Sequence, residues 1–294
     1  MEWVVLSATG GLGVVDVESS VWTARQAQQG ARADDDVIRS AVVAYDGGVG
    51  LITSTGSAHR IDTGDLPRLV PGGPWSLWDA PKAQEMIRLD APAEVVGLLS
   101  LDLDAPALAL GTRNGVVKRV SPEYNGWSQW EVMSVKPDDT IIGVSQAGEA
   151  DELVFITANA QLLRLTAREV RPQGRSAGGM AGIKVTDNSE AIFFTAVAKS
   201  DRDDVVVVTL ANGRDSVATI KQTALREYPA KGRATTGVRT HRFLKGQTHL
   251  DLAWVGIPPV RACDAKGSPR NVSNCDDRRD GTGVKVYGSF FAFG

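Results

Sequence analysis

Residues 108–120 read LALGTRNGVVKRV: an apolar run, a tight turn and a second apolar run that ends in basic residues. Asn114-Gly115 between two β-type runs is the strongest short signal for a β-hairpin, because a type I′ turn needs positive φ at both central positions. Related patterns recur with their turns near positions 11, 56, 160, 213 and 267. The chain therefore contains six units of roughly 50 residues, a period typical of repeat architectures.

The segments between these turns have the composition of short β-strands. They are rich in Val, Ile, Thr and Phe and are bounded by Gly, Asn, Asp or Pro, and no long capped stretch has a helical period. Several short strands per unit indicate a propeller-like ring, in which each blade buries its faces against its neighbours. We expect one all-β domain over residues 1–294, with approximate blades at 1–46, 47–104, 105–152, 153–204, 205–258 and 259–294.

Three cationic, glycine-rich loops precede short apolar runs. They occupy residues 171–180, 227–239 and 278–285, again about fifty residues apart. Glycine allows tight turns and a close approach of the backbone to a ligand. The glycines of these loops therefore either contact phosphates directly or only permit the turns. In the third unit Trp127 and Trp130 stand where such a loop belongs, which predicts a modified, less basic blade.

The charge of the chain is divided between its halves. Residues 1–152 carry 11 Lys and Arg against 22 Asp and Glu (net −11), and residues 153–294 carry 21 against 13 (net +8), within an overall charge of −3. Such asymmetry is a hint of a polyanion-binding face. The acidic half is expected to limit the path of a polyanion or to dock on a basic surface elsewhere.

Other functional classes find little support in the sequence. The two cysteines, Cys263 and Cys275, fit neither a zinc pattern nor a disulfide framework. Asp34-Asp35-Asp36 and Asp138-Asp139 are interpreted as solvated turns rather than metal ligands, because the EF-hand spacing is absent. The three histidines form no catalytic arrangement, although His241 among basic residues is a candidate phosphate ligand. No apolar run is long enough to span a membrane and no signal peptide is evident, so we expect a cytoplasmic protein.

The combination of a hairpin ending in Lys or Arg, a basic Gly loop and an apolar strand resembles one blade of the C-terminal domain of DNA gyrase A and its topoisomerase IV counterpart. Residues 110–119, 174–185 and 232–238 carry the resemblance, which covers nearly the whole chain and is weakest over 1–100. Through residues 226–256 the chain is most similar to a topoisomerase IV-like or second gyrase A-like subunit of actinobacteria. The resemblance implies a six-bladed β-pinwheel of four-stranded blades that exchange strands with their neighbours.

The resemblance also implies a function, namely sequence-independent binding and bending of double-stranded DNA. In gyrase the first blade carries a Gln-Arg-Arg-Gly-Gly-Lys-Gly box that is needed for wrapping. The corresponding stretch here is degenerate, with one glycine and three following aspartates, which favours a topoisomerase IV-like role in relaxation and decatenation. The residues of this degenerate wrapping box are Arg25, Gln26, Gln28, Gln29, Gly30 and Arg32.

Duplex binding of this kind needs cations that neutralise phosphates, and it needs no helix that reads bases. The expected DNA-binding residues lie in or beside the basic loops and at the ends of hairpin strands. They are Lys118, Arg119, Arg164, Arg171, Arg175, Lys184, Arg226, Lys231, Arg233, Arg239, Arg242, Lys245, Arg278, Arg279 and Lys285.

None of the tyrosines stands in the context of the family's DNA-cleavage tyrosine, so the domain is expected to be non-catalytic and to bind no cofactor. The resemblance implies that the parent enzyme uses Mg and ATP through other domains. It also implies that the partners are double-stranded DNA, the remainder of the topoisomerase A polypeptide and its B counterpart, with no membrane. The alternative is a propeller that binds a protein or a small molecule and has no DNA role, which the net charge of −3 and the acidic first half favour.

Overall fold

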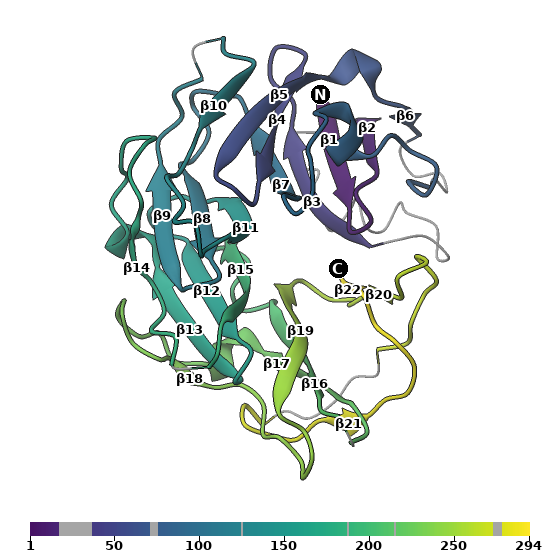
Figure 1. The fold of residues 1–294 in the computed structure, drawn as a ribbon, viewed down its shortest axis with the longest axis vertical. Coiled ribbons are helices and arrows are strands. Elements are labelled where there is room, and N and C mark those ends of the chain that lie inside the picture. The colour runs from purple at the N-terminus through teal and green to yellow at the C-terminus, as the bar shows by residue number, and fades with distance from the viewer. Residues whose placement is uncertain (18–36, 71–75, 125, 187, 215, 273–277) are drawn as a thin grey trace.

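The computed structural model describes residues 1–17, 37–70, 76–124, 126–186, 188–214, 216–272 and 278–294. Five four-stranded sheets are arranged around a centre, and we name them blades I to V in chain order (Figure 1). Among the described residues no helix is long and apolar enough to cross a membrane.

Each blade contains an antiparallel hairpin flanked by an inner and an outer strand. From the inner strand outward, blade I consists of β3 (Ile38–Val43), β1 (Glu2–Ser7), β2 (Leu12–Asp16) and β6 (Arg68–Leu69). Blade II consists of β7 (Val95–Ser100), β4 (Gly48–Thr53), β5 (Ser57–Asp62) and β10 (Gln129–Glu131). Blade III consists of β11 (Ile141–Gln146), β8 (Leu108–Thr112), β9 (Val116–Val120) and β14 (Met180–Ala181).

Blade IV consists of β15 (Ala191–Val197), β12 (Glu152–Thr157), β13 (Gln161–Thr166) and β18 (Val238–Arg239). Blade V consists of β19 (His249–Gly256), β16 (Val206–Asn212), β17 (Thr219–Ala224) and β21 (Val284–Lys285). Short helical turns connect some strands: η1 (Thr63–Asp65), α2 (Ala83–Met86), η2 (Ala167–Glu169) and η3 (Leu225–Glu227).

The number of blades differs from the prediction, because the described residues form five four-stranded blades rather than six. From the sixth unit they form a two-stranded sheet of β20 (Ala262–Cys263) and β22 (Ala292–Phe293). The predicted turn near 267 does form, with the Gly267 amide donating to the Asp264 carbonyl at 3.0 Å. However, residues 264–283 are dominated by charged residues, Gly, Ser, Asn and Pro and offer no apolar run from which a longer strand could form.

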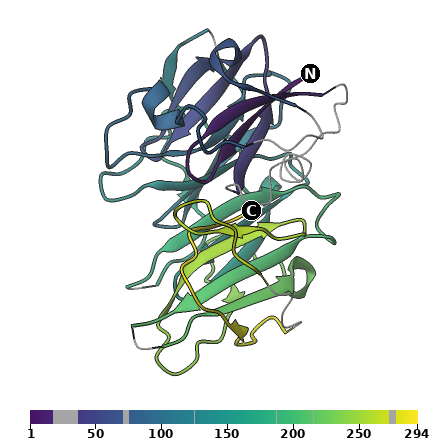
Figure 2. The ribbon, with the colours of Figure 1, turned by 90° about the vertical axis from the view of Figure 1, so that its right-hand side faces the viewer.

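This short C-terminal pair links the last blade to the first. Ala262 and Phe293 pack in a cluster with Val208 and Leu210 of blade V. Cys263 packs with Ala8 and Val37 beside blade I. In the orthogonal view the C-terminus accordingly lies between the strands of these two blades (Figure 2).

Neighbouring repeats exchange strands. The outer strand of each of blades II to V follows the hairpin of the next unit in the sequence: β10 follows β9 but pairs with β5, and β14 follows β13 but pairs with β9. In the same way β18 pairs with β13, and β21 pairs with β17. The five innermost strands line a central cavity of about 1460 Å³. The outer strands therefore lie on the perimeter, where the loops that lead into them reach the surface.

Candidate nucleic-acid interface

The three basic loops lie on the perimeter of three consecutive blades. Each precedes an outer strand: residues 171–179 lead into β14 of blade III, residues 229–237 into β18 of blade IV, and residues 278–283 into β21 of blade V (Figure 1). Glycines and prolines keep these loops out of regular sheet, and only two residues of each run pair with the blade. The fold thus brings to one edge three segments that are separated by about fifty residues in the sequence.

Each loop contains a turn at the same place. The turns span residues 174–177, 232–235 and 278–281, and arginine is the second residue of each: Arg175, Arg233 and Arg279. The Ala177 amide donates to the Gly174 carbonyl at 3.1 Å, and the Gly281 amide donates to the Arg278 carbonyl at 3.0 Å. In the middle loop the Thr235 hydroxyl closes the turn on the Gly232 carbonyl at 3.0 Å.

Hydrogen bonds join the loops into a continuous band. The Ala234 amide donates to the Gly182 carbonyl at 2.6 Å, and the Lys184 amide donates to the Thr235 carbonyl at 2.8 Å. Farther along, the Arg242 amide donates to the Gly281 carbonyl at 2.9 Å. We call residues 171–185, 229–242 and 278–285 together the basic rim. Because its parts are bonded to one another, the backbone segments that carry its charges are held in fixed relative positions.

Most of the expected cations of this region are exposed. Two of them form ion pairs that reduce their charge: Arg242 with Asp280 at 3.0 Å, and Arg226 with Glu227 at 3.7 Å. The exposed members are Arg171, Lys184, Arg226, Lys231, Arg239, Arg242, Lys245, Arg278 and Lys285.

The turn arginines are half-buried, and contacts with neighbouring groups hold the side chains of two of them in place. The Arg175 guanidinium lies 4.0 Å from the centre of the Trp127 ring, and it also approaches Glu123 at 3.9 Å. Arg233 donates to the Ala181 carbonyl at 2.8 Å, across to the neighbouring loop. Stacking and carbonyl contacts fix a guanidinium without neutralising it. Arg233 forms no ion pair among the described residues, whereas Glu123 reduces the charge of Arg175 in part.

Two of the expected DNA-binding residues, Lys118 and Arg119, are buried, and a third, Arg164, is largely buried and pairs with Glu152 at 2.7 Å. Their assignment is corrected. Lys118 has no exposed surface, and its ammonium donates to the carbonyls of Val132, Arg175 and Ala177 at 2.5–2.9 Å. Burial lowers the pKa of Lys118 to about 8, which leaves it mostly protonated at neutral pH.

Arg119 and Arg164 occupy equivalent positions in successive hairpins and connect adjacent blades. Arg119 donates to the carbonyls of Ala167 and Val170 around η2, at 3.1 and 3.3 Å. Arg164 donates to the carbonyls of Leu225 and Tyr228 around η3, at 3.0 and 3.1 Å. These guanidiniums satisfy backbone acceptors of the following unit, so they join blades rather than bind DNA.

Two further buried polar residues differ from the sequence analysis: His241 was given another role, and Lys221 was missed. His241 is buried between the hydroxyls of Thr209 and Thr219, at 2.9 and 3.1 Å from its ring nitrogens, so its candidate role as a phosphate ligand is corrected. Lys221 was not identified, although it corresponds to Lys118 in blade V and approaches the Arg278 carbonyl at 3.4 Å. The longer turn of that hairpin hid the equivalence, because Lys118 follows its turn glycine by three residues and Lys221 by eight.

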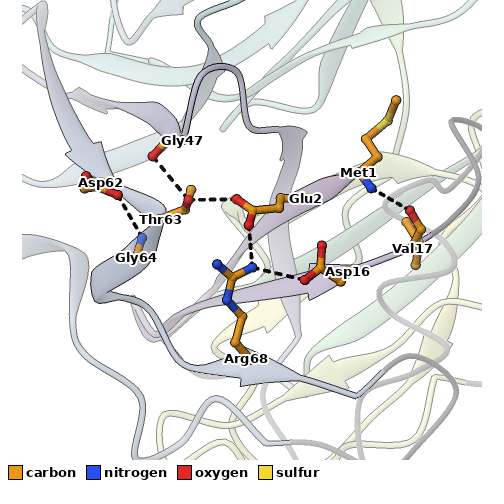
Figure 3. Close-up of polar contacts among 9 residues, drawn as sticks. All are labelled: Met1, Glu2, Asp16, Val17, Gly47, Asp62, Thr63, Gly64 and Arg68. Carbon is orange, nitrogen blue, oxygen red and sulfur yellow. Dashed lines mark hydrogen bonds and ion pairs between the residues drawn. The ribbon is translucent and has the colours of Figure 1, made fainter.

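The perimeter of the first two blades lacks a comparable display of cations among the described residues. In blade I, Arg68 of the outer strand contacts Glu2 at 2.6 Å and Asp16 at 3.2 Å, so its charge is neutralised (Figure 3). This contact, together with a hydrogen bond from Thr63, lowers the pKa of Glu2. The degenerate wrapping box at residues 25–32 lies outside the described residues. The residues that the structure describes contain no group of three potential metal ligands.

The glycines of the rim differ in how strongly the backbone requires them. Gly237 has φ +76°, and a Cβ there would collide with the carbonyl oxygen of Leu162, whereas a Cβ at Gly174 would meet no atom within 4 Å. We therefore expect Gly237→Ala to lower the free energy of unfolding by about 2–4 kcal/mol, and Gly174→Ala to change it by less than about 0.5 kcal/mol.

Chemical denaturation of the two variants beside the parent sequence measures this difference. Equal, small effects would show that Gly237 is not required by the backbone.

Comparisons with known proteins find similarity to domains of DNA gyrase A and DNA topoisomerase IV. Residues 151–199 and 218–242 match the family model described as DNA gyrase C-terminal domain, beta-propeller. The DNA gyrase A polypeptide of Mycobacterium tuberculosis is 27% identical over 219 residues, which are 72% of this chain and 24% of that protein. The chain thus spans about a quarter of the length of the curated relatives it matches.

Two solved structures share the fold over almost the whole chain. The C-terminal domain of DNA topoisomerase IV has a TM-score of 0.75 at 19% identity, covering 99% of this chain and 92% of that chain. The DNA gyrase A C-terminal domain has a TM-score of 0.67 at 15% identity, covering 99% and 98%.

Proposed function

Because the chain is similar in sequence and fold to C-terminal β-propeller domains of DNA gyrase A, we propose that it is a non-catalytic module that binds double-stranded DNA along its basic rim and bends it. The observation that carries this proposal is the basic rim itself. Cations from three repeats converge on the perimeter of three adjacent blades, and the loops that present them are hydrogen-bonded to one another.

The chemistry of the rim suits a duplex recognised without regard to sequence. Arg and Lys at loop positions neutralise phosphates and release counterions, and backbone amides of the loops add contacts to phosphate oxygens. The described residues contain no helix longer than four residues, so none of them supplies a helix to enter the major groove. Binding is therefore expected to depend on salt and to be nearly independent of base sequence.

The shape of the rim favours bending over binding of straight DNA. A duplex that follows three blades around a ring must curve, which costs on the order of a few kcal/mol. Contacts spread from Lys184 in the first loop to Lys285 in the last are able to offset that cost, whereas one compact patch would hold only a short straight segment. The neutralised Arg68 edge of blade I predicts a partial path over blades III to V.

The parent protein is proposed to be an ATP-dependent type II topoisomerase. In it this domain works with the remainder of the topoisomerase A polypeptide and its B counterpart in the bacterial cytoplasm, at the nucleoid, and Mg and ATP would be bound by other domains. The degenerate sequence at residues 25–36 supports relaxation and decatenation rather than supercoiling by wrapping. Topoisomerase assays of the parent enzyme with and without this domain test this: loss of negative supercoiling on removal would contradict the topoisomerase IV-like role.

Duplex binding is tested directly by fluorescence anisotropy with a labelled duplex of several helical turns, between about 50 and 200 mM salt. If six of the exposed rim cations contact phosphates, the logarithm of the binding constant falls with the logarithm of salt with a slope of about −5. A duplex of scrambled sequence serves as the control and is expected to bind equally. Absence of binding at the lowest salt would contradict the proposal and favour a propeller that binds another kind of partner.

A further inference from the structure

Lys118 is a buried lysine without a carboxylate partner within hydrogen-bond distance among the described residues. Its three hydrogen bonds all go to backbone carbonyls, and two of these belong to the first basic loop: Arg175 at 2.5 Å and Ala177 at 2.9 Å. The third, Val132 at 2.7 Å, belongs to the segment that follows β10. An ammonium has three N–H donors, so this arrangement uses every one of them.

The contacts of the turn at 174–178 show what this lysine does to the loop. Three of its five carbonyls are occupied within the protein: Gly174 accepts from the Ala177 amide, Arg175 accepts from Lys118, and Ala177 accepts from Lys118 and from the Ser134 amide at 3.3 Å. By contrast, the amides of Arg175, Ser176 and Gly178 donate to no acceptor in the part of the chain that the structure describes. The turn is therefore left with an excess of unused donors, which suits an anion.

Resting on the proposed function, we propose that Lys118 is a positioning residue for DNA binding. Its ammonium takes up the carbonyls of the first basic loop, so that the Arg175 side chain and the free amides of the turn are presented to a backbone phosphate. Lys118 itself does not touch the DNA, since its side chain is fully buried. It acts through the loop, which it holds from the hairpin strand β9 beneath.

Blades IV and V show how the other two loops of the basic rim are held at the position equivalent to Lys118. Lys221 stands at the same place in blade V and reaches toward the Arg278 carbonyl, the first residue of the third turn. Blade IV has Leu163 at this place. There the Lys231 amide donates to the Arg164 carbonyl at 2.8 Å, as the Gln173 amide of the first loop does to the Arg119 carbonyl at 2.9 Å. The side-chain attachment in blade IV is Arg233, which donates to the Ala181 carbonyl. In blade III the buried lysine is thus added to a backbone attachment that blade IV shares.

The first test needs no DNA. Hydrogen exchange measured by mass spectrometry on the variant Lys118→Met is expected to show the hydrogen-bonded amides within residues 171–182, such as those of Gln173 and Ala177, exchanging at least about tenfold faster than in the parent sequence. Leu12→Ala, a core change in blade I, is the control for general destabilisation and is expected to leave these amides unchanged. Unchanged exchange in Lys118→Met would overturn the positioning role.

The second test is a double-mutant cycle in the DNA-binding assay. Lys118→Met alone is expected to weaken binding about tenfold, and Arg175→Ala about fivefold. If Lys118 acts by positioning Arg175, the double variant is expected to bind DNA less than about twofold more weakly than Lys118→Met alone. Independent, multiplicative effects of the two changes would overturn the inference. If the parent sequence itself binds no DNA, the proposed function fails, and the exchange experiment still decides whether Lys118 orders the loop.

Discussion

The triple variant Lys184→Glu, Lys231→Glu and Arg239→Glu is expected to bind duplex DNA at least about 100-fold more weakly than the parent sequence at about 100 mM salt. The three residues are exposed, lie on the rim of blades III and IV, and form no ion pair among the described residues. Each reversal removes a phosphate contact and places a carboxylate against the DNA backbone. The neighbouring loops cannot compensate, because hydrogen bonds hold them in place.

The salt dependence separates loss of contacts from simple repulsion. Replacing the same three residues by glutamine is expected to reduce the salt slope by about 3, at about 0.9 per phosphate contact. Lys199→Glu, Arg202→Glu and Lys266→Glu together are the matched control. They change the net charge equally at exposed positions outside the rim, and they are expected to weaken binding by less than about threefold. An equal loss in this control would show that net charge, rather than the rim, governs affinity.

Arg119→Ala is expected to produce the largest loss of stability, about 3 kcal/mol or more. The guanidinium is 3% exposed and donates to Ala167, Val170 and, at 3.0 Å, to Ala147. Its removal takes the guanidinium donor from the Ala147 and Val170 carbonyls and opens a cavity between blades III and IV, while the Ala167 carbonyl still accepts from the Val170 amide at 2.9 Å. Burial lowers the pKa of Arg119, with nearby Glu149 and Asp151 acting in the opposite direction.

The repeat supplies the matched control for this change. Arg60 occupies the same position in blade II, but among the described residues its guanidinium donates to a single acceptor, the Asp46 carbonyl, at 3.2 Å and near the surface. Arg60→Ala is therefore expected to cost less than about 1 kcal/mol. Chemical denaturation of both variants measures the difference. Similar losses at the two positions would mean that the hydrogen bonds between blades III and IV add little to stability.

The hairpins were predictable from the sequence because their signals are local. The hairpin around Asn114-Gly115 and its flanking apolar runs became β8 and β9, with Leu110 opposite Lys118. The expected type I′ turn is wrong, because only Gly115 has positive φ and three residues, 113–115, form the loop. The basic loops were also found, since their glycines and cations stand out at a regular spacing. The exchange of strands was implied only by the family resemblance. It depends on residues about sixty positions apart, such as Met180 and Val117, and no local pattern reveals such a pairing.

The wrong assignment of Lys118 and Arg119 as DNA-binding residues has one physical cause. In an ordinary sheet with one solvated face, alternate residues of a strand reach water, so one of the neighbours Lys118 and Arg119 is expected to be exposed. Here β9 is covered on both faces by blades and on its open edge by β14, and both side chains are buried. Their charges are tolerated because backbone carbonyls of loops and helical turns face them. Those carbonyls come from segments that are distant in the sequence, so no local pattern near Lys118 or Arg119 predicts them.

Strand exchange also determines how this protein can be recombined. A chimera cut at the visual border between two sheets would separate β9 from β14, or β13 from β18, and leave each blade with an open edge. A cut between the inner strand and the next hairpin divides the chain into units that each bring a hairpin and donate an outer strand backwards. Modular engineering of the rim, such as grafting a more cationic loop from one blade to another, is therefore best done with units that begin at β8, β12 or β16.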